Sequence, residues 1–350
     1  LPVGCRYRKC LGGAGRCSWS EMLEGKAMRF IIYGAGGVGG TIGAELHLAG
    51  ESVVLIARGA HLDAIQRNGL RYETPFRKEV LSIPAVGHPR DITFGTDDVV
   101  ILTMKSQHTR DALDDLRRAA GVEVPVICCQ NGIANEDMAL RRFRRVYAMV
   151  VYLPGESLEP GVVHCHSLKK IGILDAGVYP SGTDTLIEEV ARHLEGANMA
   201  CVPTANAMDW KYGKLIQNTG NALAACRKGE DTRSLRKRMR DEAMRCFDAA
   251  GIPYKTVEEI QERRAGIFEI GEIGGVARAG GSSWQSLANG RPDVESDYLN
   301  GEIVRLGRLH GVPTPVNAAM QNLMDRMVRS GAAPNSLSLA DIEALIDAEV

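Results

Sequence analysis

The sequence predicts an α/β fold at its N-terminal end, followed by an all-α C-terminal domain. Three observations support this prediction. Apolar runs of strand length alternate with helical patterns from residue 28 to about residue 205. These runs are continuous rather than alternating, which is typical of a parallel sheet covered by helices on both faces. From about residue 206 the strand-like runs disappear and a 3.6-residue period dominates. We therefore expect a parallel-sheet domain over 28–205 and a helical domain over 206–350.

The elements of the first domain are expected in a strand and helix alternation. Residues 28–33 form an apolar run of strand length, and a helical pattern follows a glycine-rich turn and ends before Gly50. The next apolar run, 52–57, completes a βαβ unit of about 30 residues. The remaining expected elements are a helix at 61–67, a β-rich stretch at 70–86, strands at 99–103 and 124–130, helices at 107–120 and near 135, β structure within 145–175, and a helix at 183–196.

Composition excludes several classes of protein. The 350-residue chain has 42 Lys and Arg against 43 Asp and Glu, so it has no basic excess that would attract a nucleic acid or an anionic membrane. No window of 18 apolar residues is present, which argues against a membrane span. Its nine cysteines form no CxxC pair and show no ligand-like spacing with histidines, so we expect a reduced, cytoplasmic protein and no metal site. The basic run 227–240 is expected to be a solvated helix face.

Residues 1–27 are expected to be an extension outside the fold. They carry five basic and two acidic residues with Gly and Ser between them, and they lack the continuous apolar segment of a secretory signal. Met28 directly precedes the first strand. A targeting role is the alternative.

A glycine-rich turn joins the first strand to the first helix. It reads Gly34, Ala35, Gly36, Gly37, Val38 and Gly39, which is a GxGxxG motif. The motif lies at a strand-to-helix turn, where its glycines can bind a pyrophosphate. Gly34 permits the tight turn, Gly36 lets the backbone approach a pyrophosphate, and Gly39 lets the helix pack on the strand. The helix N-terminus offers free N–H groups to phosphates. The pattern predicts a Rossmann-type dinucleotide site.

The end of the second strand indicates which dinucleotide binds. An NAD site usually has a carboxylate there that accepts hydrogen bonds from the ribose 2′-hydroxyl. This chain has Ala57 and Arg58 instead. An arginine can bind a 2′-phosphate through charge-assisted hydrogen bonds, so the sequence favours NADP, as NADPH, over NAD. The alternative is an ordinary surface arginine.

Polar residues follow two further strands. Lys105 comes after the run 99–103, and Asn131 after the run 124–130. Both are expected at the carboxyl edge of the sheet, where open α/β sheets bind ligands. We interpret them as contacts to the nicotinamide half of the cofactor or to the substrate. Either could instead cap a helix.

One helix of the C-terminal domain has an unusually polar face. Lys214 and Asn218 are four residues apart and share a face, and Asn221 lies about one turn further. A lysine facing a cofactor cleft can protonate a carbonyl oxygen as hydride reaches the carbon, and desolvation would lower its pKa into the working range. By spacing alone, a surface lysine is equally compatible.

Five motifs in this order resemble the ketopantoate reductase (2-dehydropantoate 2-reductase) family, over nearly all of residues 28–330. They are GAGGVGG at 34–40, TMKSQ at 103–107, QNG at 130–132, WKYGKLIQN at 210–218, and the long segment SSWQSLANGRPDVESDYLNGEIVRLGRLHGVPTPVN at 282–317. The resemblance implies NADPH-dependent reduction of a 2-oxo acid to a 2-hydroxy acid. In the family this reaction reduces 2-dehydropantoate to pantoate for pantothenate and coenzyme A synthesis.

The resemblance also implies roles for individual residues. Lys214 matches the catalytic lysine that donates the proton, and Asn131 matches an asparagine near nicotinamide and substrate. Asn218 and Ser283 match substrate-binding positions. Glu295 matches a glutamate that holds the cofactor and the active-site geometry.

The chain departs from the family pattern directly after Asn218. There it reads TGNALAA, where the family commonly has a second asparagine in an NPLTA-like stretch, so Asn221 would fill that role at an altered angle. Another 2-oxo acid is therefore an alternative substrate. Two further alternatives are an opine or 3-hydroxy acid dehydrogenase and a non-catalytic NADPH-binding protein. Sequence alone is compatible with a homodimer or a monomer.

Overall fold

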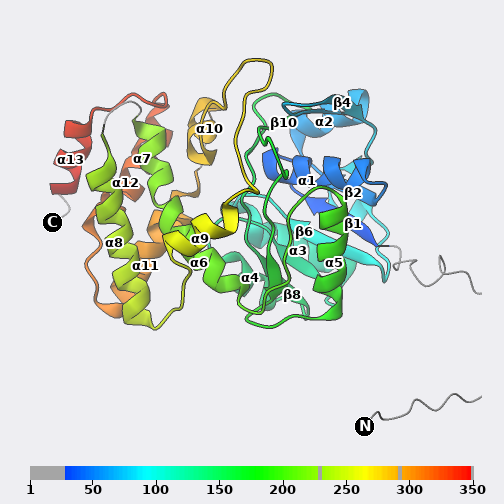
Figure 1. The fold of residues 1–350 in the computed structure, drawn as a ribbon, viewed down its shortest axis with the longest axis horizontal. Coiled ribbons are helices and arrows are strands. Elements are labelled where there is room, and N and C mark those ends of the chain that lie inside the picture. Colours follow the sequence, from blue (N-terminus) through cyan, green and yellow to red (C-terminus); the bar gives the residue numbers. More distant parts are fainter. Residues whose placement is uncertain (1–27, 228–230, 291–293, 348–350) are drawn as a thin grey trace, which may run out of the picture.

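A computed structural model describes residues 28–227, 231–290 and 294–347. The extension expected at 1–27 lies outside these residues. The described chain has an α/β part, from β1 to α5, and a helical part, from α6 to α13, which lie side by side (Figure 1). None of the helices in the described ranges has both the length and the apolar character needed to cross a membrane.

The α/β part is built on a seven-stranded sheet of order β11-β8-β7-β6-β1-β2-β5. All neighbouring pairs in it are parallel except β11 with β8. Its strands are β1 (Arg29–Tyr33), β2 (Ser52–Ile56), β5 (Ala85–Val86), β6 (Asp98–Leu102), β7 (Val126–Cys128), β8 (Val146–Met149) and β11 (Ala176–Val178). The order places β1 between β2 and β6: the chain first adds β2 and β5 on one side of β1, and then β6, β7 and β8 on the other. The carboxyl ends of β1 and β6 therefore form a switch point for ligand binding.

Helices cover both faces of this sheet, because successive side chains of a strand point to opposite faces. Phe30 and Ile32 pack with α1 and α5, whereas Ile31 packs with α3 and α4 on the other face. The helices of this part are α1 (Gly37–Leu48), α2 (Gly59–Asn68), α3 (Thr109–Ala120), α4 (Asn135–Leu140) and α5 (Thr185–Gly196), with short 3-10 turns η1 (Pro89–Asp91) and η2 (Ser106–His108). Burial on both faces explains why the strands read as continuous apolar runs.

A second, four-stranded sheet packs on α1. Its order is β4-β3-β10-β9, from β3 (Leu70–Glu73), β4 (Lys78–Leu81), β9 (Gly155–Glu156) and β10 (Val162–Cys165). Val163 and Cys165 of β10 belong to the same apolar core as α1. The small sheet thus brings β9 against the start of α1.

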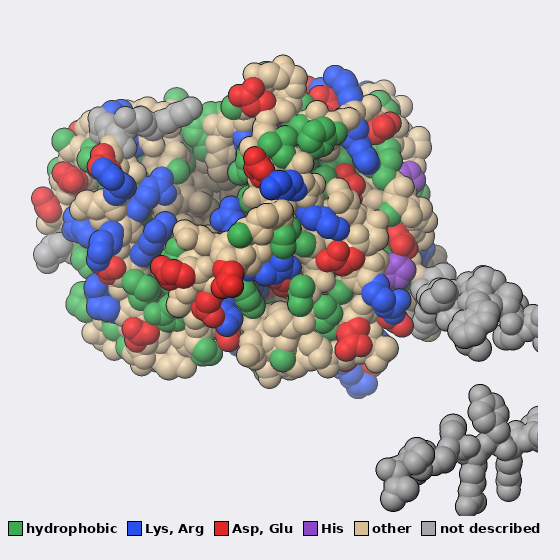
Figure 2. All heavy atoms as spheres, in the orientation of Figure 1, with side chains coloured by type: hydrophobic (Ala, Val, Ile, Leu, Met, Phe, Trp, Pro, Cys, Tyr) green, Lys and Arg blue, Asp and Glu red, His purple; other side chains and the backbone are tan. Residues whose placement is uncertain are grey.

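The helical part surrounds two apolar clusters. Its elements are α6 (Ala207–Asn218), α7 (Gly220–Cys226), α8 (Arg233–Ala250), α9 (Val257–Arg264), α10 (Ser282–Ala288), η3 (Glu295–Tyr298), α11 (Asn300–His310), α12 (Pro315–Ser330) and α13 (Leu339–Asp347). One cluster joins α7, α8, α12 and α13, and the other joins α6, α8 and α11. Ile133 and Ala148 of the α/β part also belong to the second cluster, so apolar packing crosses between the parts. Lys and Arg side chains gather over α8 on the surface in Figure 2.

The predicted fold class is confirmed, and the bounds of several expected elements differ by a few residues. The strand expected at 124–130 is β7, which spans Val126–Cys128, and the helix expected from residue 107 begins at Thr109 after a 3-10 turn. The basic run 227–240 was expected to be a solvated helix face, and one of its residues on α8 is an exception. Arg236 is partly buried and donates to the carbonyl oxygen of Gly220 at 3.4 Å.

Candidate active site at the carboxyl edge of the sheet

The glycine-rich turn leaves β1 and enters α1. Gly34 has a φ of +111°, and a Cβ there would lie 2.7 Å from the backbone nitrogen of Met104 on the neighbouring strand end. A Cβ on Gly39 would lie 2.2 Å from the carbonyl oxygen of Gly34, so this glycine allows the helix to approach the turn. A Cβ on Gly36 would meet nothing within 4 Å. Gly36 therefore faces open space at the N-terminus of α1, where a phosphate can approach the backbone.

The turn is also held from the side of the small sheet. A Cβ on Gly37 would lie 2.7 Å from the backbone nitrogen of Glu156, so β9 packs directly on the turn. His61 of α2 bonds to the turn through Nε2, 2.7 Å from the carbonyl oxygen of Ala35, while its Nδ1 accepts from the N–H of Gly161 at 3.0 Å. Because Nδ1 accepts, Nε2 carries the proton and donates. His61 thus links the turn to the loop before β10.

A cavity of about 650 Å³ opens in front of the turn. The sequence-predicted residues that line it are Gly34, Ala35, Gly36, Gly37, Val38, Arg58, Lys105, Asn131 and Glu295. Gly39 lies behind it, packed against β1 and Thr103. The structure therefore brings the cofactor candidates from five separate segments into one cavity, at the predicted edge of the sheet.

Arg58 lies at one end of this cavity, as the N-cap residue of α2 directly after β2. Its side chain is exposed. It acts electrostatically on Tyr33, whose pKa is raised to about 12 by burial and by Asp115, with Arg58 opposing the shift. A dinucleotide whose pyrophosphate binds at the turn could therefore bring a group at its ribose 2′ position to Arg58.

Lys105 links the sheet edge to the helical part. It is the N-cap residue of η2, and its ammonium donates to the hydroxyl of Ser286 on α10. Ser282, Gln285 and Ser286, spaced three and four residues apart, present one face of α10 to the cavity. The buried Ser283 lies off this face, on a helix that packs against α7.

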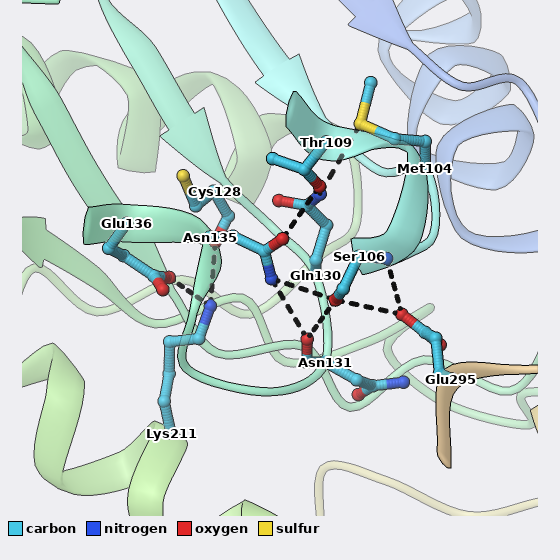
Figure 3. A network of polar contacts seen from close by, with 10 residues as sticks. All are labelled: Met104, Ser106, Thr109, Cys128, Gln130, Asn131, Asn135, Glu136, Lys211 and Glu295. Atoms are coloured by element: carbon cyan, nitrogen blue, oxygen red, sulfur yellow. Dashed lines mark hydrogen bonds and ion pairs between the residues drawn. The ribbon is translucent and has the colours of Figure 1, made fainter. Parts of the chain in front are cut away.

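A buried polar network forms the floor of the site (Figure 3). Glu295 accepts from the backbone N–H of Ser106 at 2.9 Å and lies 3.2 Å from its hydroxyl. Asn135 donates to the Ser106 hydroxyl at 3.1 Å. Asn131 accepts through its backbone oxygen, whereas its side-chain oxygen is buried without a hydrogen-bond partner among the described residues. Glu295 therefore fixes the loop after β6, and the Asn131 amide is available to a ligand.

Lys214 lies on α6 with its ammonium 4.7 Å from the centre of the Tyr152 ring. Arg264 of α9 stacks over the same ring at 5.3 Å. Burial lowers the pKa of Lys214 to about 7, and the positive charges of Lys211 and Arg264 act in the same direction. Such a lysine exchanges protons near neutral pH, which is what a general acid requires.

Two residues of the cavity act on Lys214. The carboxylate of Glu295 opposes the lowering of its pKa, as the Cys129 thiol would if it were ionised, and both residues line the cavity. Burial raises the pKa of Cys129 to about 12, so this thiol is neutral near pH 7. The lysine candidate and the cofactor candidates are therefore parts of one electrostatic environment.

A buried ion pair fixes α6 to the sheet edge. Lys211 of α6 pairs with Glu136 of α4 and donates to the backbone oxygen of Cys128 at 3.1 Å (Figure 3). The side chains of Lys211 and Glu136 are 2% and 0% exposed. Burial raises the pKa of Glu136, and Lys211 opposes this shift. Since Lys214 is three residues along the same helix, the pair also positions the Lys214 side chain.

The chain after Asn218 passes from one helix directly into the next. Helix α6 ends at Asn218 and α7 begins at Gly220, and Thr219 between them keeps helical dihedral angles, with φ −55° and ψ −30°. The carbonyl oxygen of Thr219 accepts from Asn300 at 3.0 Å. Asn221 lies in the first turn of α7. The Nδ2 atom of Asn218 is buried without a hydrogen-bond partner among the described residues.

Several residues of the site were missed from the sequence. They are His61, Ser106, Tyr152, Glu136, Lys211 and Arg264. Ser106 stands beside Lys105 in TMKSQ, and Lys211 stands in WKYGKLIQN, so these two were within motifs already singled out. Lys211 and Lys214 are three residues apart, so they lie on the same side of a helix. If Lys214 points inward, the spacing predicts that Lys211 does too. Tyr152 and Arg264 come from distant segments and carry no local signal.

The strand order, the glycine turn and a lysine of lowered pKa beside one cavity define a nicotinamide-dinucleotide-dependent oxidoreductase. Residues 30–176 match the family described as "Ketopantoate reductase PanE/ApbA", and residues 197–328 match "Ketopantoate reductase PanE/ApbA C terminal". The chain belongs to the ketopantoate reductase family. This confirms the predicted family and the predicted NADP-dependent oxidoreductase acting on a CH–OH group.

Individual proteins that resemble this chain include members of the same family. A 2-dehydropantoate 2-reductase of Mesorhizobium japonicum is 29% identical over 331 residues, which cover 86% of this chain and 98% of the relative. The crystal structure of a PanE/ApbA family ketopantoate reductase from Ralstonia eutropha JMP134 is 28% identical, with a TM-score of 0.72 and coverage of 87% and 99%. D-mandelate dehydrogenase with NADH and anilino(oxo)acetate has a TM-score of 0.75 at 22% identity, with the same coverage, and this likeness concerns the fold alone.

Proposed function

We propose that this protein reduces a 2-oxo acid with NADPH, with 2-dehydropantoate as the leading substrate and pantoate as the product, in pantothenate and coenzyme A synthesis. The observation that carries the proposal is Lys214, which lies against the Tyr152 ring, has its pKa lowered to about 7, and interacts electrostatically with Glu295 of the cavity lining. When bound, the nicotinamide supplies the hydride. Lys214 donates a proton to the carbonyl oxygen of the substrate and orients this oxygen electrostatically.

The cavity fits a dinucleotide at the proposed cofactor residues. Gly36 leaves open space at the N-terminus of α1, and Arg58 would bind the 2′-phosphate at the far end. Lys105, Asn131 and Glu295 would surround the nicotinamide half. We accordingly assign residues 28–205 to cofactor binding and 206–350 to the catalytic, substrate-binding domain.

Unpartnered polar atoms support a polar substrate on the other side of the cavity. Buried atoms without hydrogen-bond partners among the described residues include Asn131 Oδ1, Asn218 Nδ2 and Ser282 Oγ. Asn131 and Ser282 line the cavity, and buried polar groups are normally paired, so their two free oxygens indicate a ligand that pairs with them. We retain Asn218, Asn221 and Ser283 as proposed substrate contacts from the family resemblance; Ser283 is next to Ser282 but lies off the face of α10 that lines the cavity.

A second candidate is a different 2-oxo acid. The sequence after Asn218 departs from the family pattern, and Arg264 adds a positive charge beside Tyr152. An aromatic ring and an arginine would suit a 2-oxo acid with an aromatic or a second acidic group. The structural neighbour D-mandelate dehydrogenase is named for mandelate, which is an aromatic 2-hydroxy acid.

The deciding experiment is a panel of 2-oxo acids, assayed for oxidation of NADPH and of NADH. The panel contains 2-dehydropantoate, 2-oxoisovalerate, 2-oxoglutarate and benzoylformate. We expect the highest kcat/KM for 2-dehydropantoate with NADPH. A higher value for benzoylformate or 2-oxoglutarate would replace the leading substrate, and a preference for NADH would remove the proposed role of Arg58.

Assembly and location are part of the proposal. A ketopantoate reductase of Staphylococcus aureus is described as dimeric, and we propose a homodimer here too. Light scattering coupled to gel filtration measures the mass directly, and a mass of one chain would contradict it. We also propose a cytoplasmic location, since the cofactor and the proposed pathway are cytoplasmic.

A further inference from the structure

A cluster of potential metal ligands lies on the small sheet, outside the cavity. Glu156, His164 and His166 each offer one ligand atom, and these atoms lie within 4.8 Å of one another. His164 and His166 are two residues apart along β10 and its end, so they share a face of the sheet. Glu156 on β9 is directly opposite His164 in the antiparallel register. Three strand positions thus bring a carboxylate and two imidazoles to one point.

The distances suit a first-row divalent ion. Glu156 Oε1 lies 3.4 Å from His166 Nε2 and 3.8 Å from His164 Nδ1. In a tetrahedral zinc site with bonds of about 2.0–2.1 Å, neighbouring ligand atoms lie about 3.3 Å apart. The two distances to Glu156 are therefore within about 0.5 Å of this geometry, and the two histidine nitrogens, which lie within 4.8 Å of each other, would have to approach to bind such an ion.

Two of the three residues are buried and hold polar atoms without hydrogen bonds. His166 is 2% exposed and Glu156 is 5% exposed. His166 Nε2, which faces Glu156 Oε1 at 3.4 Å, has no hydrogen-bond partner among the described residues, and neither has Oε2, the other carboxylate oxygen of Glu156. His164 is 27% exposed, which leaves a path for an ion and a coordinating water. Buried polar atoms are normally paired, so these two atoms indicate a ligand beside them.

The outer contact of His166 matches that of a metal ligand. A metal-binding imidazole usually donates its other N–H to a backbone carbonyl or a carboxylate, which fixes the ring. His166 Nδ1 lies 3.2 Å from the carbonyl oxygen of Gly271 and, facing an acceptor, carries the proton. His164 Nε2 lies 3.8 Å from Glu73 Oε2 on β3, which is beyond hydrogen-bond distance. Both rings turn one nitrogen toward Glu156.

Nearby charges permit a cation. Glu73 is already paired with Lys78 at 2.9 Å and Arg71 at 3.2 Å. Arg278 lies near Glu156 but donates to the carbonyl oxygen of Gly155 at 3.4 Å. Gly155 and Glu156 form β9, which packs on the glycine-rich turn, so an ion here would fasten β9, β10 and the 269–271 segment together.

We propose that Glu156, His164 and His166 form a structural zinc site, with water as the fourth ligand. The N2O donor set suits zinc, a borderline ion that accepts imidazole and carboxylate. The site goes beyond the proposed reductase activity and takes no part in it. It also differs from the sequence expectation of no metal site, because the sequence shows H-x-H but not that Glu156 lies opposite.

The test is zinc binding by tag-free, full-length protein after chelator treatment and dialysis. We expect one additional zinc per chain relative to the Glu156→Gln variant and a rise in Tm of a few degrees on adding zinc. Cobalt should give the visible absorption of a tetrahedral site. The variants Glu156→Gln and His164→Ala should each weaken zinc binding about 100-fold. His164→Ala removes a partly exposed ligand, so it still tests the site if Glu156→Gln, at a buried position, fails to fold.

A matched control separates this site from an ordinary histidine and glutamate pair. His193 lies 2.7 Å from Glu51 with a similar His–Glu contact, and no third ligand is recorded there among the described residues. His193→Gln should leave zinc uptake unchanged. Equal zinc uptake by the wild type, Glu156→Gln and His164→Ala would mean that other groups, such as the thiols of Cys5, Cys10 and Cys17, hold the ion. That result, or no zinc-dependent rise in Tm, would overturn the proposal.

Discussion

The two sides of the active site are built in different ways. The dinucleotide side is centred on one continuous segment, from β1 through the glycine turn into α1, whose shape depends on Gly34, Gly36 and Gly39. The lysine side combines Lys214 of α6 with Tyr152 and Arg264 from distant segments. The first side is specified by local backbone geometry and the second by tertiary packing. The two sides should therefore respond differently to substitution.

The largest effect is expected at the buried pair that fastens α6 to the α/β part. Lys211→Met would leave the carboxylate of Glu136 buried without its partner, which typically costs about 3–5 kcal/mol of unfolding free energy. The double variant Lys211→Met/Glu136→Leu should recover most of this loss, because both charges are then absent. Urea denaturation followed by circular dichroism measures both.

The control for this prediction is an exposed lysine pair. Lys237 is 76% exposed and pairs with Asp241 on α8. Lys237→Met should change the unfolding free energy by no more than about 0.5 kcal/mol. Equal losses for Lys211→Met and Lys237→Met would contradict the structural role of the buried pair.

Removal of the lysine at the reacting centre should separate turnover from cofactor binding. Lys214→Ala is expected to lower kcat by ~10²-fold or more, because it removes the general acid. The dissociation constant for NADPH, measured by fluorescence titration, should stay within about threefold of wild type, since the glycine turn is untouched. A variant that turns over near the wild-type rate with normal cofactor binding would show that another group donates the proton.

The opposite pattern is expected at the other end of the cavity. Arg58→Ala should raise the KM for NADPH by about 10- to 100-fold, the effect of losing a charge-assisted contact to a phosphate, while the KM for NADH stays unchanged. Arg67→Ala, at an exposed arginine of the same helix α2, is the matched control and should alter neither value. If Arg58→Ala weakens both dinucleotides equally, Arg58 does not recognise the 2′-phosphate.

The same contrast explains what the sequence could predict. The fold class and the cofactor candidates follow from short-range patterns: apolar runs, a glycine turn, and residues at strand ends. These patterns depend on contacts within about 30 residues, which single-sequence reasoning describes well. The cavity contains Arg58, Lys105 and Asn131 together, and also Glu295, which only the family resemblance had indicated.

Contacts between distant segments could not be predicted from the sequence. Nothing local indicates that Lys211 pairs with Glu136, 75 residues away, or that Tyr152 lies under Lys214. The metal candidate shows the same limit, since Glu156 and His164 become neighbours only through the register of β9 and β10. Buried charge pairs and mixed ligand sets are properties of the assembled fold, so their partners have to be read from the structure.

The smallest predicted effect tests the electrostatic link between Arg264 and Lys214. Reduction needs Lys214 in its protonated form, so the rate should fall as the pH rises through about 7, the pKa of Lys214, whereas oxidation of the hydroxy acid should rise through the same range. Arg264 lowers this pKa, so Arg264→Leu should raise it and move both limbs to higher pH. We expect the reduction rate at pH 8.5, relative to the same variant at pH 6, to exceed the wild-type ratio by a factor of roughly two or three.

Rates at two pH values are compared within one variant because Arg264 could also contact the substrate, and a loss of affinity would lower both rates alike. Arg233→Leu removes an exposed arginine on α8 that pairs with Asp231, and its pH profile should match that of the wild type. If the two limbs of Arg264→Leu stay at the wild-type pH, Arg264 does not lower the pKa of Lys214. Burial and the charge of Lys211 would then account for the lowering, and α6 with the elements packed on it would set the pKa without α9.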